Sequence, residues 1–171
     1  MNKIYTWEKN NNMKFNATKF EMIRYGKNEE LKDNTVYFGP DMKDVIERKE
    51  NTRDLGVIIN DKLNFNNHVD KVVQNTKRKM GLLSRTFEGR EKGLMMKLWK
   101  TYCIPVLDYG SPLYVNPEKK TQLKRLENLQ RQWTKKIEGM NQMSYWERLK
   151  STKLHRKTKQ KNPHNIYLED S

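Results

Sequence analysis

Lysine and arginine side chains at helical spacing are the residues in this sequence with the clearest chemistry. Lys71, Arg78 and Arg85 are seven residues apart, so in a helix they share one face, with Lys77 and Lys79 beside them. Such side chains can follow a phosphate backbone without reading the base sequence. An ordinary solvated helix face gives the same pattern. The charge balance of the whole chain is the observation that favours phosphate binding over a solvated face.

That balance is strongly positive and unevenly distributed. The 171 residues include 35 Lys and Arg against 21 Asp and Glu, a formal net charge of +14. Residues 61–154 carry 20 basic and 9 acidic residues, whereas residues 1–60 carry 11 and 10. The excess favours a polyanionic partner, nucleic acid first and an anionic membrane second. Further candidate contacts on the expected second and third helices are Lys97, Lys100, Lys120, Lys124, Arg131 and Lys135.

Residue types that support catalysis or metal binding are scattered. Two-metal nucleotidyl transfer needs clustered carboxylates, and no two acidic residues stand together in an apolar strand setting. His68, His155 and His164 do not pair at the spacing of a helical zinc site. The single cysteine, Cys103, excludes a disulfide and lies among apolar residues, which favours a packed thiol. We predict no catalytic residues, no metal site and no cofactor.

The elements that position these side chains fall into two parts, which predicts an α+β fold. A helix end in residues 1–12 precedes short strands in residues 19–25, 35–38 and 53–59. In the last strand Leu55, Val57 and Ile59 share a face, and Gly56 suggests a bulge or a close backbone approach.

From about residue 66 the apolar period becomes helical, which predicts a basic bundle. The first helix has its apolar stripe at Val69, Val72, Val73, Thr76, Met80, Leu83 and Phe87. The second runs from about Arg90 to Cys103, with a stripe at Leu94, Met95, Leu98, Trp99 and Tyr102, and is ended or kinked by Pro105. The third begins at Asn116, Pro117 and Glu118, and a fourth at Ser144, which has capping-box spacing to Glu147.

Membrane insertion and secretion are not expected. The longest aliphatic run is Val57-Ile58-Ile59, far short of a membrane span, and the first twelve residues contain no apolar leader segment. We expect an intracellular protein, nuclear or cytoplasmic.

Long stretches of the chain resemble the C-terminal part of reverse transcriptases of non-LTR retrotransposons, the jockey-like and LINE class of RNA-directed DNA polymerases. The matching stretches are residues 54–87 and 94–140, and the second contains Ile104, Pro105, Leu107, Asp108, Tyr109, Gly110 and Ser111 in the aliphatic-Pro-aliphatic-acidic-Tyr-small pattern. SYWERL at residues 144–149 also fits. Residues 13–26 look like polymerase motif D, with Asn16 and Lys19 in the characteristic places, and Leu55-Gly56 looks like motif E of the primer grip.

The resemblance implies that residues 1–64 are the end of a palm and residues 65–151 a helical thumb, followed by a disordered or divergent tail at 152–171. A thumb of this kind holds a template–primer duplex by its backbone, so the implied partner is an RNA–DNA or DNA duplex. The metal-binding aspartates of the family have no counterpart here, and we expect no polymerase activity from these residues alone. Lys19 matches a proton-donor position, which has nothing to protonate without the metals.

Two alternatives stay open. The bundle could be a protein-interaction module that uses an exposed face, or the chain could be a decayed transposon reading frame with no selected function. Because isolated hairpins are marginal in water, we also predict that residues 1–60 are poorly packed or mobile.

Overall fold

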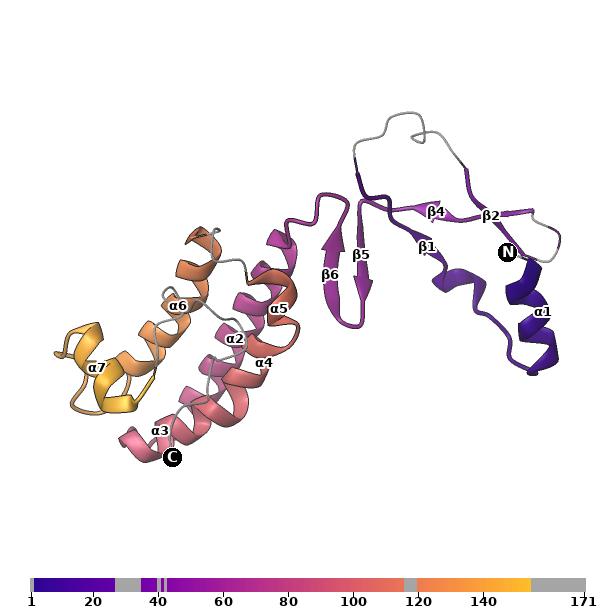
Figure 1. Ribbon diagram of the computed structural model, residues 1–171. Coiled ribbons are helices and arrows are strands. Elements are labelled where there is room, and N and C mark those ends of the chain that lie inside the picture. Colours follow the sequence, from indigo (N-terminus) through magenta and orange to yellow (C-terminus); the bar gives the residue numbers. More distant parts are fainter. Residues whose placement is uncertain (1, 27–34, 40, 42, 116–119, 155–171) are drawn as a thin grey trace. The chain divides into compact units, whose positions relative to one another are not determined.

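The computed structural model describes residues 2–26, 35–39, 41, 43–115 and 120–154 and has a mixed α and β fold (Figure 1). The chain divides into two compact units, Met1–Phe65 and Asn66–Ser171. The predicted third-helix start, at residues 116–118, and most of the predicted tail, at 155–171, lie outside the described residues.

The first unit begins with helix α1 (Asn2–Asn10) and a short 3-10 turn, η1 (Ala17–Lys19). Its strands are β1 (Glu21–Met22), β2 (Tyr37–Phe38), β3 (Asp44–Val45), β4 (Glu47–Arg48), β5 (Asn51–Asp54) and β6 (Val57–Asn60). They form three two-stranded sheets among the described residues: β1 with β4 in parallel, and β2 with β3 and β5 with β6 antiparallel. The predicted helix in residues 1–12 is confirmed.

The predicted single strand over residues 53–59 is wrong. Strands β5 and β6 form a hairpin in which Asp54 pairs with Val57, so Leu55 and Gly56 are the two turn residues. Their φ angles are +44° and +87°. Two-residue turns with positive φ at both positions match the twist of the strands, and Gly adopts that conformation without strain. Leu55 is therefore 82% exposed at the hairpin tip and does not share a face with Val57.

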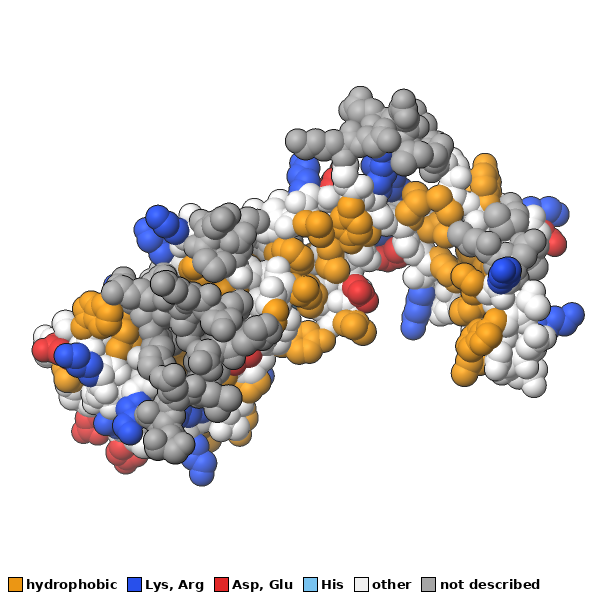
Figure 2. Space-filling model, in the orientation of Figure 1, with side chains coloured by type: hydrophobic (Ala, Val, Ile, Leu, Met, Phe, Trp, Pro, Cys, Tyr) orange, Lys and Arg blue, Asp and Glu red, His pale blue; other side chains and the backbone are white. Residues whose placement is uncertain are grey.

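The first unit has a sparse core. Among its described residues, Phe38 and Val57 are the fully buried large apolar side chains. An aromatic chain of ring contacts joins Tyr5 and Trp7 to Phe15, Phe15 to Phe20, and Phe20 to Phe38. Figure 2 shows apolar side chains open to solvent over this unit, and the large ones that are exposed are Ile4, Trp7, Met13, Tyr25, Tyr37, Val45, Leu55 and Leu63.

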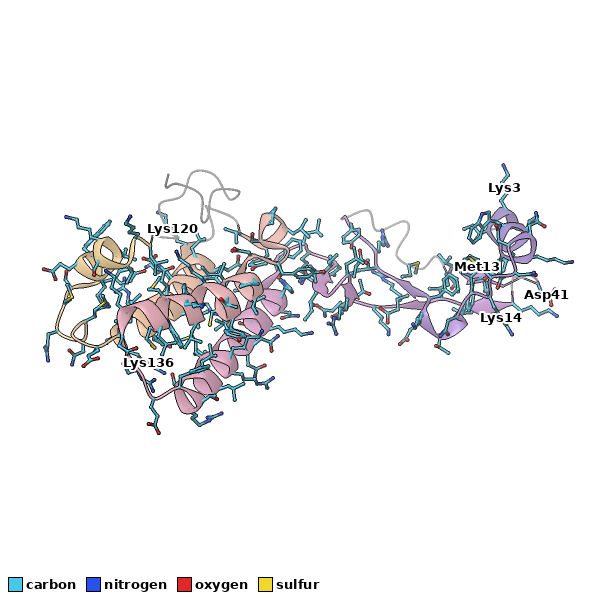
Figure 3. The ribbon with its side chains drawn as sticks, turned by 90° about the horizontal axis from the view of Figure 1, so that it is seen from below. Lys3, Met13, Lys14, Asp41, Lys120 and Lys136 are labelled. Carbon is cyan, nitrogen blue, oxygen red and sulfur yellow. The ribbon has the colours of Figure 1, made fainter. Side chains whose placement is uncertain are left out.

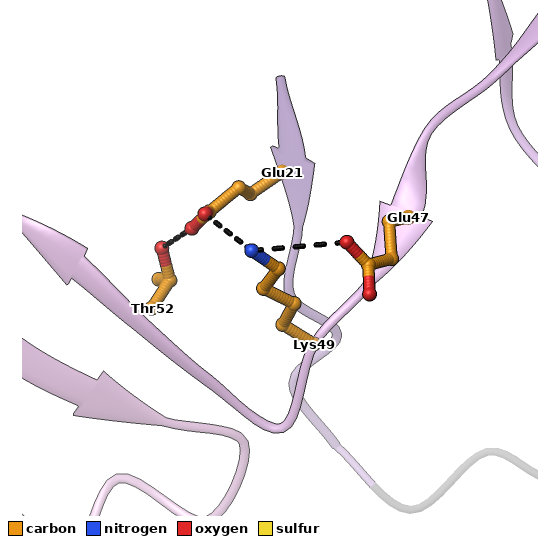
Figure 4. Close-up of polar contacts among 4 residues, drawn as sticks. All are labelled: Glu21, Glu47, Lys49 and Thr52. Atoms are coloured by element: carbon orange, nitrogen blue, oxygen red, sulfur yellow. Dashed lines mark hydrogen bonds and ion pairs between the residues drawn. The ribbon is translucent and has the colours of Figure 1, made fainter. Parts of the chain in front are cut away.

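Polar contacts connect the short strands of this unit (Figure 4). Lys49 Nζ lies 2.6 Å from Glu21 Oε1 and 3.8 Å from Glu47 Oε2, and the Thr52 hydroxyl donates to Glu21 Oε2 at 2.5 Å. These hydrogen bonds lower the pKa of Glu21 and raise that of Lys49. Because the groups are solvent-exposed, they fix geometry more than they stabilise the unit.

The second unit is helical. Its elements are α2 (Asn66–Thr86), α3 (Lys92–Leu98), a π-turn η3 (Trp99–Cys103), α4 (Ile104–Asp108), α5 (Ser111–Tyr114), α6 (Lys120–Lys135) and α7 (Tyr145–Thr152). Every member of the predicted first stripe is buried except the half-buried Phe87, which follows the helix. The Trp99 and Trp133 rings stack at 5.9 Å in the core, and Trp133 Nε1 donates to the Met95 carbonyl at 2.9 Å.

Pro105 was predicted to end or kink the second helix, and it does not end it, because helical structure continues through Pro105 to Asp108. The Ile104 N–H donates to the Trp99 carbonyl, five residues back, which widens one turn of the helix. Pro105 has no N–H to offer the Thr101 carbonyl, and a wider turn gives its ring room. The extra residue shifts the apolar stripe, so Cys103 is fully buried and Tyr102 is 46% exposed. The prediction that Tyr102 belongs to the stripe is therefore wrong.

The ends of two helices are closed by side chains. Ser144 and Glu147 form the predicted capping box of α7, with the Ser144 N–H donating to Glu147 Oε2 at 2.7 Å and the Glu147 N–H to Ser144 Oγ at 3.3 Å. At the C-terminus of α2, Arg90 donates to the carbonyls of Ser84, Phe87 and Gly89. Helix α7 includes Thr152, and Leu154 beyond it is buried, so these residues belong to the helical unit.

Candidate nucleic-acid interface

Helix α2 presents a row of cations on its outer side. Lys71, Arg78 and Arg85 drift by about 20° per seven-residue step, so they stay on one face, about 10 Å apart along the helix axis. That face is opposite the buried stripe centred on Val69, Thr76 and Leu83. Arg78 and Arg85 are exposed and Lys71 is half-buried. We call these three residues the α2 row.

Helices α2 and α6 run parallel along a polar seam. Gln122 Nε2 donates to Asn66 Oδ1 at 2.6 Å near the N-terminal ends, Arg125 forms an ion pair with Asp70, and Lys136 Nζ contacts Ser84 Oγ at 2.9 Å near the C-terminal ends. The residue numbers of the paired side chains increase in the same direction along both helices, which shows that the helices are parallel. Lys120 is the first residue of α6 and Lys136 directly follows its last, and Figure 3 labels both.

The solvent face of α6 carries a second row of cations. Lys120, Lys124, Arg131 and Lys135 are exposed and follow each other at steps of four, seven and four residues. We call them the α6 row. The other exposed residues of the helix are Thr121, Asn128 and Gln132, and its one carboxylate, Glu127, is buried. The α6 surface that solvent reaches therefore has no acidic residue.

The remaining predicted cations lie at other places on the same unit. Lys77 is seven residues from both Asp70 and Ser84, so it lies on the α2 edge that faces α6. The charge of Lys79 acts on the Cys103 thiol, which puts Lys79 on the η3 side of α2. Lys97 on α3 and Lys100 on η3 are exposed. The α2 and α6 rows thus lie on two neighbouring parallel helices, and Lys79 faces a different neighbour.

The four predicted site residues of the first unit have local structural roles. Asn16 Oδ1 accepts from the Thr18 N–H at 3.0 Å and the Thr18 hydroxyl at 2.7 Å, which opens the η1 turn that ends at the exposed Lys19. Leu55 and Gly56 form the β5–β6 turn.

Several residues that shape the helical unit were not predicted from the sequence. Arg148 is buried beside α6, Arg90 closes α2, and His68 is 3% exposed with its ring 4.9 Å from that of Tyr114. Tyr114 is buried and donates to the Leu107 carbonyl, so it is not available to stack on a base. Only Arg90 could have been found from sequence, because a cation after a helix can bind its last carbonyls.

Burial sets the ionisation of the core groups. Desolvation lowers the pKa of His68, with a smaller contribution from the Lys71 charge, and raises the pKa of Cys103 to about 11. Desolvation likewise raises the pKa of Tyr114, and the Asp108 charge adds to the shift. In the described part of the chain no three His, Cys, Asp or Glu residues lie close enough to hold a metal ion. None of the described helices combines the length and apolar character needed to cross a membrane.

Part of the chain is similar to a nematode protein. A Caenorhabditis elegans protein described as uncharacterized protein B0403.1 is 36% identical over 74 residues. The match covers 43% of this chain and 37% of that protein, so the chain aligns with well under half the length of this relative. No family model matches the chain. No solved structure matches it either.

Proposed function

We propose that the helical unit holds a nucleic-acid duplex by its phosphate backbone, as a polymerase thumb does, without catalysis of its own. In this proposal the chain derives from the reverse transcriptase of a non-LTR retrotransposon, which its resemblance over residues 54–87 and 94–140 supports. The partner is an RNA–DNA or DNA duplex, contacted through the α2 and α6 rows.

One observation carries the proposal: two parallel helices expose cations with almost no opposing charge. Asp70 is the one carboxylate at the surface of either helix, and Arg125 already pairs with it. Soluble surfaces ordinarily intersperse both signs, so a face this one-sided is suited to a polyanion. The rows flank the seam between the helices, where amide and hydroxyl side chains can donate hydrogen bonds to phosphate oxygens.

A titration of the full chain with a labelled RNA–DNA hybrid tests this proposal. Fluorescence anisotropy at about 50 and 200 mM salt should give saturable binding, and log affinity should fall by about 0.9 per phosphate contact for each tenfold rise in salt. Reversing the α2 row to glutamate (K71E, R78E and R85E together) should abolish it. The matched control reverses the exposed Lys3, Lys9 and Lys14 of the first unit, which changes the net charge equally.

Two results would contradict the proposal. One is no binding at low salt by protein that circular dichroism shows to be helical. The other is equal loss in the α2-row variant and in its control, because net charge alone would then explain the binding.

A protein contact is the second candidate function, favoured by the corner between α4 and α5. Tyr109 and Leu113 are both more than half exposed there, on either side of Gly110 with φ of +69°. Exposed aromatic side chains such as Tyr109 are enriched at protein interfaces, and Leu113 extends the apolar surface beside it. Partner binding of this kind should survive high salt and be lost in a Y109A/L113A variant, whereas backbone binding should behave in the opposite way.

A further inference from the structure

The corner between α6 and α7 contains a buried guanidinium that forms no ion pair with a carboxylate of the described residues. Arg148 is 6% exposed. Its Nε donates to Thr134 Oγ1 at 3.2 Å and its Nη1 to the Met143 carbonyl at 2.6 Å. The other N–H donors of this five-donor group have no acceptor among the described residues. A cation this buried is costly unless an opposite charge compensates it.

A second guanidinium lies against the same aromatic ring. Arg131 Cζ is 4.3 Å and Arg148 Cζ is 5.6 Å from the centre of the Tyr145 ring, so the two guanidinium carbons lie within 10 Å of each other. Neither forms an ion pair with a carboxylate in the described part of the chain. The ring attracts both cations, and an anion bound beside them would offset the repulsion between their like charges.

We propose that Arg131 and Arg148 form a phosphate-binding site at the α6–α7 corner, with Tyr145 holding both guanidiniums in place. The proposal rests on the proposed function, because the ligand is a phosphodiester of the bound nucleic acid. Arg131 belongs to the α6 row, so a strand that follows Lys120 and Lys124 along the helix reaches this corner next.

The two arginines have different parts in this site. Arg148 is fixed by Thr134 and Met143, so it loses little conformational freedom when it binds an anion. Arg131 is exposed and can leave the ring to meet the phosphate. Both guanidiniums can donate two parallel hydrogen bonds to phosphate oxygens, which a lysine cannot.

The test uses duplex affinity of the full chain and two variants of the corner. R131Q should lower affinity about tenfold and reduce the salt slope by about 0.9. R148K keeps the charge but loses the planar fork, and it should also weaken binding while circular dichroism stays native. The matched control is K150Q, an equal charge change at an exposed position of α7 about half a turn from Arg148. Its affinity should stay within about twofold of wild type.

The outcomes separate this site from the proposed function. If wild type binds duplex and R131Q behaves as K150Q does, the corner site is refuted while backbone binding stands. If polyglutamate displaces the labelled duplex as well as unlabelled duplex does, the ligand of the corner is an acidic peptide and the phosphodiester proposal is refuted. If wild type binds no duplex, both the proposed function and the phosphodiester ligand fail. Inorganic phosphate is then the remaining probe: a phosphate-dependent shift of the Arg148 Nε–H resonance would identify a free-phosphate site, and no shift would exclude any site.

Discussion

Arg125 of helix α6 forms an ion pair with Asp70 of helix α2, 55 residues earlier in the chain. Asp70 is the single acidic residue of α2, and the single acidic residue of α6, Glu127, is buried. The pair therefore joins two parallel helices and also cancels the one negative charge on their common surface. Both side chains remain partly exposed, so the pair contributes more to surface charge than to stability.

Replacing Asp70 by asparagine should strengthen duplex binding. The variant removes a carboxylate and releases Arg125 to contact phosphate, so the salt slope should rise by up to about 0.9. The free energy of unfolding should change by less than about 1 kcal/mol. Anisotropy titration and urea unfolding measure the two quantities, with Asp54→Asn on the first-unit hairpin as the control. Weaker binding by Asp70→Asn would mean that the ion pair positions the interface.

The widened turn before Pro105 predicts the reactivity of two neighbouring positions. Cys103 is fully buried and its pKa is raised to about 11, so at pH 8 the native thiol should react with a disulfide reagent only after unfolding. A cysteine introduced at Tyr102, in a variant with Cys103→Ala, should react readily in the native protein. Rapid reaction of native Cys103 together with protection at position 102 would show an ordinary α-helical register.

Burial of His68 predicts a pH dependence of the helical unit. The folded-state pKa of His68 lies below the unfolded value of 6.5, so the unfolded state takes up a proton first as the pH falls. The stabilisation is complete above pH 6.5 and is lost below it, with a slope of at most about 1.4 kcal/mol per pH unit. Urea unfolding at several pH values between 5 and 7.5 should show this slope, and His68→Phe should remove it. An unchanged slope in the variant would assign it to other groups.

Hydrogen exchange should distinguish the two units. The first unit has short strands and few buried apolar side chains, so amides at Phe20–Tyr25 should exchange with little protection. Amides along α2, whose inner face is fully packed, should be the slowest to exchange. Strong protection at Phe20–Tyr25 would contradict the prediction that residues 1–60 are poorly packed.

Local patterns in the sequence were enough to predict much of the helical unit. The stripe of α2 and the capping box of α7 depend on residues three or four apart, and such neighbours meet in any regular helix. The α+β class was predictable for the same reason, because the change from strand to helical period occurs at one point, near residue 66. The mixed pattern at residues 53–59 failed, since one Gly can mark either a bulge or a hairpin turn, and strand pairing decides which.

Three features of the candidate site depend on the tertiary structure. The ion pair of Asp70 with Arg125 and the meeting of Arg131 and Arg148 at Tyr145 join residues on different helices, and no spacing along the chain encodes such contacts. The exposure of Tyr102 depends on an extra residue in one helical turn, which is tolerated because Cys103 and Trp99 pack the core in its place. The amino-acid sequence alone determines the residue types and the net positive charge. The packing of one helix on another determined which cations lie at the surface and that Arg148 is buried.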